Sequence, residues 1–423
     1  MRQTATIELV ETEIPQARLS KTMAVERKPG LLSWLLPRMI GLLLVVDIVL
    51  RFFPIDLFCF RAWECMTRYQ EPGAIFQANA QFQKDRTYGN LANMANLPEL
   101  RQYRPQRFTT DAYGFRNPSL HAGRRVAALF VGDSFLAGDA VSDGDTLPEQ
   151  LGALTGLQFY NAGGPYAYLA TVRSLKDKLG LKQGRVIVVQ TQGVSGPMLR
   201  DAEAGIRRDW KGQALRALVG AHGDRVRSWI RGWWYVSPLR ILLQRGYMAL
   251  SNDRILPNVY ADKVIARRLR SGDTMLFYRP EVEAYRAGRD MADVAEYLTW
   301  LATALKREGF DLAVVLVPNK YSVYHSLLAD GINDPPLARH PYAQLAERLT
   351  SSGLDVLNLT PQLQACAARQ AGARQYLYWL DDTHWNRDGI AMAARSIEQA
   401  WFPSENAQPA RDVCADVSAR VAK

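Results

Sequence analysis

Residues 125–135 read RVAALFVGDSF, and this stretch decides the fold. Residues 126–131 are all apolar, which is typical of a short strand buried in a parallel sheet. The run stops at Gly132, and Asp133 and Ser134 follow at once. The polar pair indicates either a simple turn or a serine held at the end of a sheet so that it can attack a substrate. The second interpretation requires a histidine and a carboxylate elsewhere in the chain.

Four further apolar runs predict strands of the same kind: LQFYNAGG (157–164), RVIVVQT (185–191), DLAVVLVP (311–318) and LDVLNL (354–359). Helical patterns separate them, at 145–151 with a capping-box pair (Thr146 and Glu149), at 291–310 and at 388–401. Strands that alternate with helices indicate an α/β domain whose parallel sheet is covered on both faces. In such sheets ligands bind at the carboxyl ends of the strands.

The composition is that of a globular protein. The 423 residues are 48% hydrophobic and 22% charged, with a formal net charge of +10. Residues 200–270 hold much of the excess, with 15 Lys/Arg against 6 Asp/Glu. A basic block can bind nucleic acid, but no nucleic-acid motif accompanies it, so we expect no such partner. A solvated helical face is the other interpretation.

Residues 198–290 interrupt the alternation and predict a largely helical, basic insertion. Four aromatic residues lie among arginines within it: Trp229, Trp233, Trp234 and Tyr235. Such a mixture suits a membrane interface. A hydrophobic face packed on the main domain is the alternative.

Residues 31–58 predict a transmembrane helix, because the window from Leu31 to Phe53 is mostly apolar. Basic residues gather before it, which places residues 1–30 in the cytoplasm and all that follows outside the inner membrane. We therefore expect a single-pass inner-membrane protein with a periplasmic domain. Residues 59–106 read as a connector.

The four cysteines lack the spacing of metal ligands. None of Cys59, Cys65, Cys366 and Cys414 belongs to a CxxC pair. In an exported domain Cys366 and Cys414 could form a disulfide, and buried free thiols are an equally good interpretation. Residues 403–423 are expected to form a C-terminal tail.

A base for Ser134 is available in YLYWLDDTHWNRDG (376–389). Here His384 follows Asp381 and Asp382, so a nearby carboxylate can bond one ring nitrogen while the other nitrogen accepts the serine proton. A buried structural histidine is the alternative for His384.

These motifs resemble the SGNH (GDSL-like) hydrolase superfamily. Gly132-Asp133-Ser134 resembles the first block, 161–164 (NAGG) the second, and 381–384 (DDTH) the DxxH block. The resemblance covers residues 107–402 and implies a three-layer sandwich. It also implies Ser134 as nucleophile, His384 as base, Asp381 as acid, and an oxyanion hole from the N–H groups of Ser134, Gly163 and Gly164.

A closer resemblance is to periplasmic proteins that O-acetylate alginate and other secreted polysaccharides. It rests on VVLVPNKYSVYHSLL (314–328) and YLYWLDDTHWN (376–386), with a Pro-x-Lys strand end and a DTHW motif. The acid of that motif matches Asp382. In those proteins DTHW precedes the serine, whereas here Ser134 comes first, so Asp381 is favoured and Asp382 stays the alternative.

The same resemblance implies that Asn319, Lys320 and Trp385 line the site and contact sugar or acceptor.

The third SGNH block departs from the pattern. It normally carries Gly-x-Asn-Asp, whose Asn donates to the oxyanion, but here the strand ends in QTQGVSG (190–196). Gln192 or Ser195 could donate instead, or the hole has backbone donors only. One lost donor costs about 2.7–4 kcal/mol of transition-state stabilisation.

We therefore expect a membrane-anchored serine O-acyltransferase or acetylesterase that acts outside the cytoplasm on a cell-envelope or secreted polysaccharide. No metal or cofactor is expected, and a membrane protein could supply the acyl group. The alternative is a non-catalytic SGNH-like scaffold in a polysaccharide export or modification complex.

Overall fold

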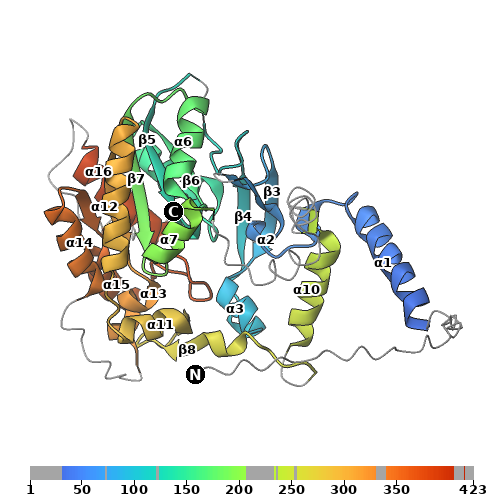
Figure 1. The fold of residues 1–423 in the computed structure, drawn as a ribbon. Helices are drawn as coiled ribbons and strands as arrows, with labels where there is room; N and C mark the ends of the chain where they lie inside the picture. The colour runs from blue at the N-terminus through green and yellow to red at the C-terminus, as the bar shows by residue number, and fades with distance from the viewer. Residues whose placement is uncertain are drawn as a thin grey trace, which may run out of the picture. The chain divides into compact units, whose positions relative to one another are not determined.

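The computed structural model describes residues 31–71, 74–120, 123–205, 233–234, 237–251, 255–329, 340–403 and 414. The chain divides into two units, Met1–Ile48 and Val49–Lys423. The second unit holds a five-stranded sheet with helices on both faces (Figure 1). The molecule is therefore of the α/β class, as predicted.

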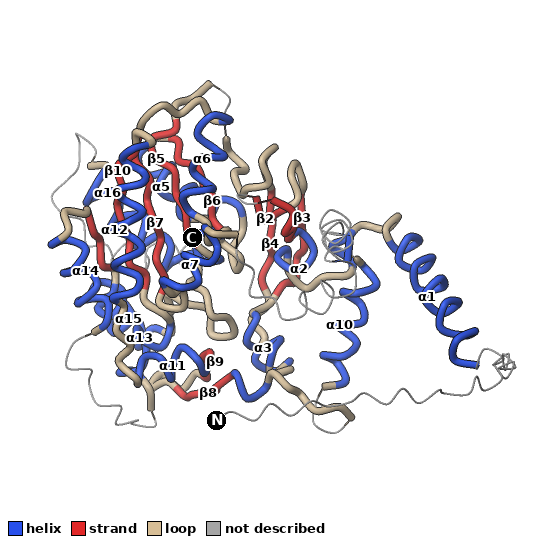
Figure 2. The backbone as a smooth tube through the Cα atoms, in the orientation of Figure 1, coloured by secondary structure: helices blue, strands red, loops and turns tan. Residues whose placement is uncertain are grey.

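All five predicted strands form this sheet: β5 (Val126–Gly132), β6 (Gln158–Gly163), β7 (Gly184–Thr191), β10 (Phe310–Val317) and β11 (Asp355–Asn358). They lie in the order β11-β10-β7-β5-β6, and every neighbouring pair is parallel. Figure 2 shows β10, β7, β5 and β6 side by side in this sheet. The carboxyl ends of β5, β7 and β10 therefore meet at one edge of the sheet.

Alternate residues of β5 enter two different cores. Ala128 and Phe130 pack in one core and Leu129 and Val131 in the other, because successive side chains of a strand point to opposite faces. One core is completed by α5 (Leu147–Thr155), α13 (Lys320–Tyr324), α15 (Thr360–Gln370) and α16 (Arg387–Trp401). The other is completed by α6 (Tyr168–Lys178), α7 (Gly196–Glu203), α12 (Ala292–Arg307) and α14 (Pro341–Ser351).

The predicted helix at 145–151 begins where expected, at Leu147, with Thr146 in the N-cap position. Its capping box does not form, since the Thr146 hydroxyl makes no capping hydrogen bond. The fixed φ of Pro148 in the first turn favours the helix start instead.

Residues 59–106, which the sequence suggested to be a connector, carry several elements. They are α2 (Ala62–Met66), β1 (Thr67–Glu71), β2 (Ala74–Phe76), β3 (Gln81–Thr87), α3 (Asn90–Met94) and the start of β4 (Arg104–Thr109). β1 pairs with β2 and β3 with β4, both antiparallel. A separate apolar core, which includes Cys65, Phe76 and Phe108, holds these elements together.

The predicted insertion, 198–290, lies partly within the described residues. It includes α10 (Pro238–Leu250), the antiparallel pair β8 (Val264–Arg268) and β9 (Thr274–Tyr278), and α11 (Arg279–Arg286). The strands add β structure to a segment predicted as largely helical. Of its four aromatic residues, Trp229 and Tyr235 lie outside the described residues, and Trp234 is 48% exposed.

The transmembrane anchor predicted over 31–58 is not found. Helix α1 runs from Leu31 to Leu50 and includes Pro37, and Pro54 follows shortly after, where a helix cannot readily continue. Within the described ranges, no helix is both long and apolar enough to cross a membrane.

Each interpretation of the cysteines holds for one pair. Cys366 and Cys414 form a disulfide, with Cα atoms 5.4 Å apart. Cys59 and Cys65 are buried free thiols. The disulfide ties the described residue of the C-terminal tail to α15.

Candidate active site

Ser134 is the first residue of the short helix α4 (Ser134–Ala137), which follows β5 directly. Asp133 caps this helix, because its carboxylate accepts a hydrogen bond from the N–H of Phe135 at 2.9 Å. The Thr191 hydroxyl, at the end of β7, donates to the other Asp133 oxygen at 2.5 Å. Asp133 therefore braces the turn that presents the serine at the sheet edge.

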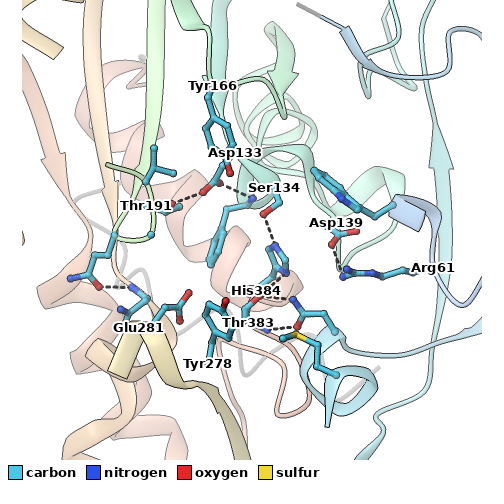
Figure 3. Close-up of a pocket in the computed structure, with 18 residues that line it drawn as sticks. Arg61, Asp133, Ser134, Asp139, Tyr166, Thr191, Tyr278, Glu281, Thr383 and His384 are labelled. Atoms are coloured by element: carbon cyan, nitrogen blue, oxygen red, sulfur yellow. Dashed lines mark hydrogen bonds and ion pairs between the residues drawn. The ribbon is translucent and has the colours of Figure 1, made fainter. Parts of the chain in front are cut away.

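Ser134, His384 and Asp382 form one chain of hydrogen bonds. Figure 3 shows the first of these bonds, between Ser134 and His384. The Ser134 Oγ lies 2.8 Å from His384 Nε2, and His384 Nδ1 lies 2.6 Å from Asp382 Oδ1. The same carboxylate oxygen accepts from the backbone N–H of His384 at 3.0 Å. The arrangement is that of a nucleophile, a base and an orienting acid.

Asp381, which the sequence favoured as the acid, does not bond the imidazole. Its side chain turns the other way and accepts from the N–H groups of Gly89 at 2.7 Å and Gln102 at 2.9 Å. Arg104 Nη1 completes its shell at 2.9 Å. The residue three before the histidine is thus structural here, and the residue two before it carries the contact.

The neighbours of Asp382 hold it ionised. Its second oxygen accepts from the N–H of Asn90 at 2.8 Å and from Arg104 at 3.4 Å. Burial acts to raise the pKa of Asp382, but the charge of His384, its hydrogen bond and the arginines Arg104 and Arg61 hold it well below its usual range.

The imidazole is affected in the opposite sense. Burial acts to lower the pKa of His384, but the Asp382 carboxylate outweighs it and raises this pKa above its usual value. His384 is 5% exposed, and the ring of Phe135 lies beside it at 4.8 Å between centroids. A more basic imidazole is better able to take the serine proton.

Lys320, expected to contact substrate, is buried behind the site. Its Nζ donates to the backbone carbonyls of Trp379, Leu380 and Asp382 at 2.8, 3.3 and 2.6 Å. Burial lowers the pKa of Lys320 to about 7, against the opposing effect of Asp382. Its place in the structure is to hold the loop that carries the acid and the base.

Trp385 is also buried, at 1% exposure, so its ring cannot receive a sugar. Its indole N–H donates to the carbonyl of Phe135 at 3.2 Å, which joins the histidine loop to α4. Asn319, by contrast, does line the pocket. Its side-chain oxygen caps α13 by accepting from the N–H of Ser322 at 2.8 Å.

The predicted oxyanion donors are only partly in place. The N–H of Gly163 donates to the Asn161 side chain at 2.9 Å, and that of Gly164 donates to the Gly132 carbonyl at 2.8 Å. Both glycine N–H groups are therefore engaged within the fold. Ser134, as the first residue of α4, has an N–H that the helix itself does not use.

The two candidates proposed for the missing third-block Asn take different positions. Ser195 caps α7, with its hydroxyl accepting from the N–H of Met198 at 3.4 Å. Gln192 lines the pocket, and its side-chain oxygen accepts from the N–H of Asn319 and the hydroxyl of Ser322, both at 2.8 Å.

A pocket of about 370 Å³ opens over Ser134 and His384. One wall is the sheet edge, with Thr191, Gln192, Gly193 and Asn319, and the opposite wall comes from the N-terminal elements, with Arg61, Trp63, Asn90 and Met94. Glu281 of α11 also faces it (Figure 3). The surrounding protein desolvates this carboxyl and raises its pKa to about 7.

The N-terminal wall is the part of the site that sequence analysis missed. Asn90 exchanges two hydrogen bonds of 3.0 Å with Thr383, next to the histidine. Arg61 pairs with Asp139 at 2.6 Å. Gly89 permits the close approach, because a Cβ there would lie 2.0 Å from the carbonyl oxygen of Asp381. None of these residues stands in a motif. In the sequence, only the length of the segment before the first predicted strand indicated that further structure could lie there.

Within the described ranges, no cluster of three or more His, Cys, Asp or Glu residues could hold a metal ion. The hydrogen-bonded hydroxyl, imidazole and carboxylate of Ser134, His384 and Asp382 form an arrangement that can carry acyl chemistry.

A comparison with protein families agrees with this geometry. Residues 270–416 match the SGNH hydrolase-like domain of the acetyltransferase AlgX. The matched region, about a third of the chain, includes Asp382, His384 and Cys414, and Ser134 lies before it. The match confirms the resemblance to the SGNH superfamily and to alginate-type O-acetylation proteins, and it supports acyl transfer or hydrolysis in general. No curated protein matches the chain.

Proposed function

We propose that the protein is a serine O-acyltransferase or acetylesterase that acts on a cell-envelope or secreted polysaccharide outside the cytoplasm. The observation that carries this proposal is the hydrogen-bond chain from Ser134 through His384 to Asp382, at 2.8 and 2.6 Å, inside a pocket. The similarity of residues 270–416 to an acetyltransferase domain supports the same chemistry.

The reaction starts when Ser134 Oγ attacks the carbonyl carbon of an acetyl ester. His384 Nε2 takes the hydroxyl proton, and Asp382 stabilises the resulting imidazolium. The tetrahedral intermediate collapses, the bond to the donor oxygen breaks, and His384 returns the proton to that leaving group. Ser134 is then acetylated.

In the second half a sugar hydroxyl or water attacks the acetyl-serine. His384 removes the proton of the attacking oxygen, the ester bond to Ser134 breaks, and the proton passes to the serine oxygen. A sugar acceptor gives transfer, and water gives hydrolysis. Transfer is the outcome we propose when an acceptor fills the pocket, since a bound sugar excludes water from the acetyl-enzyme.

The developing oxyanion needs donors close to Ser134. The N–H of Ser134 is one, and we place the second in the wall formed by Gly193 and Asn319, since both line the pocket. The side-chain NH₂ group of Asn319 would then donate a hydrogen bond to the oxyanion in place of the missing third-block Asn. A single such donor is worth about 2.7–4 kcal/mol.

The extracytoplasmic location is supported by the disulfide between Cys366 and Cys414, because disulfides persist in oxidising compartments. A membrane protein at the inner membrane would supply the acetyl group there. The proposal thus includes an extracytoplasmic location, a membrane protein as acetyl donor, and an SGNH-type arrangement of the sheet.

A non-catalytic scaffold is the second candidate. It is favoured by the third block without Asn and by the engagement of the Gly163 and Gly164 N–H groups. A scaffold would leave Ser134 unreactive.

A fluorophosphonate probe separates the two candidates. We expect it to label the wild-type chain at Ser134 and to leave Ser134→Ala unlabelled. Ser134→Ala should also lose hydrolysis of p-nitrophenyl acetate by roughly 10⁶-fold while its circular dichroism spectrum stays native. An unlabelled wild-type protein, or a Ser134→Ala variant with full activity, would establish the scaffold or another nucleophile.

A further inference from the structure

A second hollow adjoins the Ser134 pocket. Each has a volume of about 370 Å³, and both are lined by Arg61, Trp63, Asn90 and Met94. The second hollow extends from these shared residues along α2 to α10, which packs beside α2 (Figure 1). A groove thus leads away from the nucleophile over elements that lie outside the region matched to the acetyltransferase domain.

Half of the residues that line the second hollow carry an aromatic ring or a side-chain amide. Trp63 packs its edge on Phe76 at 5.3 Å between centroids, and Tyr260 is 41% exposed. Asn93 and Gln244 supply amides. The Gln244 oxygen accepts from Arg240 at 3.1 Å, so its NH₂ group is the end that can serve a ligand.

The charged side chains of the groove have polar partners within the protein. Arg61 is paired with Asp139 at 2.6 Å, Arg240 also donates to the backbone carbonyl of Glu64 at 3.3 Å, and the Glu64 carboxylate accepts from the N–H of Phe60 at 3.0 Å. A long acyl chain would leave the amides without partners, at a cost in desolvation. A row of sugar rings satisfies both kinds of lining, because hydroxyls pair with amides and the apolar ring faces pack on aromatic faces.

We propose that this second hollow is an acceptor subsite that binds further sugar units of a polysaccharide chain while one hydroxyl of the chain lies at Ser134. The inference rests on the proposed function and names its substrate as a chain rather than a single sugar. Asn90 links the two positions, since it lines both hollows and bonds Thr383 beside His384. A sugar chain that binds in the groove is therefore held at a fixed position relative to His384.

The test uses two ladders of oligosaccharides of two to eight units, one of mannuronate and one of cello-oligosaccharides. Calorimetric titration of the Ser134→Ala protein measures binding without turnover. We expect the affinity for at least one ladder to rise with length. Gln244→Ala and Tyr260→Ala should weaken binding of the long members by about tenfold each, the size of one lost hydrogen bond or ring contact, and should hardly change the shortest.

Two matched variants make the result specific. Leu243→Ala truncates the neighbouring residue of α10, which is 56% exposed and does not line the hollow, and should leave binding unchanged. Tyr260→Phe keeps the ring and should retain most of the affinity. Binding that does not depend on length, equal losses for short and long members, or an equal loss in Leu243→Ala would each overturn the subsite.

Failure of the subsite can be told from failure of the proposed function. If wild-type protein is labelled at Ser134 by fluorophosphonate but no oligosaccharide of either ladder binds, the subsite is wrong and the serine chemistry stands. If the ladders bind with the expected length dependence but Ser134 is unreactive, the groove binds a glycan and the catalytic proposal is wrong.

Discussion

The two walls of the pocket differ in how they reach the nucleophile. The sheet wall places Ser134, Thr191 and Asn319 at the ends of neighbouring parallel strands, so backbone topology alone brings them together. The N-terminal wall has no place in that sheet. It reaches the site through hydrogen bonds to the loop of Asp381 and Asp382, donated by the backbone N–H of Asn90 and by the side chain of Arg104.

The two walls therefore contribute different parts of the site. The sheet wall supplies the candidate nucleophile, Ser134, and the N-terminal wall holds the loop that carries the candidate base and acid, His384 and Asp382. The adjacent aspartates mark the boundary, because Asp382 points to the imidazole and Asp381 points to Gly89 and Arg104. Changes on the two sides should therefore affect different properties, chemistry on one and stability on the other.

The largest expected effect separates the two aspartates. Asp382→Asn should lower the rate of p-nitrophenyl acetate hydrolysis roughly 10⁴-fold, because an amide favours the wrong imidazole tautomer. Asp381→Asn should cost at most about tenfold in rate, since it does not touch His384, and should lower the melting temperature instead. A larger rate loss in Asp381→Asn would reverse the assignment of the acid.

Arg104→Met tests how strongly the N-terminal wall stabilises the loop of Asp381 and Asp382. It leaves the buried carboxylate of Asp381 without its cationic partner and should lower the free energy of unfolding by about 3–5 kcal/mol. Arg107→Met is the matched control on the same strand, since Arg107 is 61% exposed and lies 3.8 Å from Asp143, a pair worth about 0–1 kcal/mol. Urea denaturation measures both, and equal losses would contradict a specific role for Arg104.

The disulfide between Cys366 and Cys414 lies outside both walls of the pocket and tests the stability of the sheet domain as a whole. Its cysteines are 48 residues apart, and a closed loop of that length stabilises the fold by about 4 kcal/mol in the chain-entropy account. The double variant Cys366→Ala/Cys414→Ala should lose that amount. A reductant should lower the melting temperature of the wild type and leave the double variant unaffected. No response of the wild type to reductant would mean that the cysteines are free thiols in solution.

The smallest expected effect concerns pH. His384 accepts the serine proton only when neutral, so kcat/KM should fall as pH falls through its pKa. Because Asp382 raises that pKa, the fall should begin above the ordinary value of about 6.5. In Asp382→Asn the residual activity should persist to lower pH.

Glu281 is the necessary control for this profile, since its own pKa lies at about 7. Glu281→Gln should keep a limb that titrates with His384. If the limb disappears in Glu281→Gln, the titration belongs to that carboxyl.

Much of the sheet side could be predicted from local patterns. The five strands were found as apolar runs and Ser134 as a polar residue directly after one of them, because strand burial and turn chemistry act over a few neighbouring residues. His384 was found from the two aspartates that precede it in the sequence. The pair of aspartates was also visible in the sequence, and the family resemblance left the choice between them open. The structure places Asp382 and not the favoured Asp381 against the imidazole, since order along the chain does not fix which way a carboxylate turns.

The N-terminal wall could not be predicted in this way. Arg104, Asn90 and Gly89 lie almost 300 residues before the aspartates that they bond, with separations between 277 and 292. Similarly, Lys320 and Trp385 stand in motifs that suggested substrate contact, yet both are buried as braces. Burial depends on what packs over a residue, and the covering elements come from distant parts of the chain.

The sequence by itself therefore determined the α/β class, the strands, and Ser134 and His384 as the candidate nucleophile and base, since each depends on short-range periodicity and residue type. Tertiary structure alone decided that Asp382 faces the imidazole and that Trp63 and Asn90 line the pocket. It also decided that the N–H groups of Gly163 and Gly164 donate hydrogen bonds within the fold. The physical reason is that hydrogen-bond partners and solvent exposure are set by three-dimensional packing, which a linear pattern does not record.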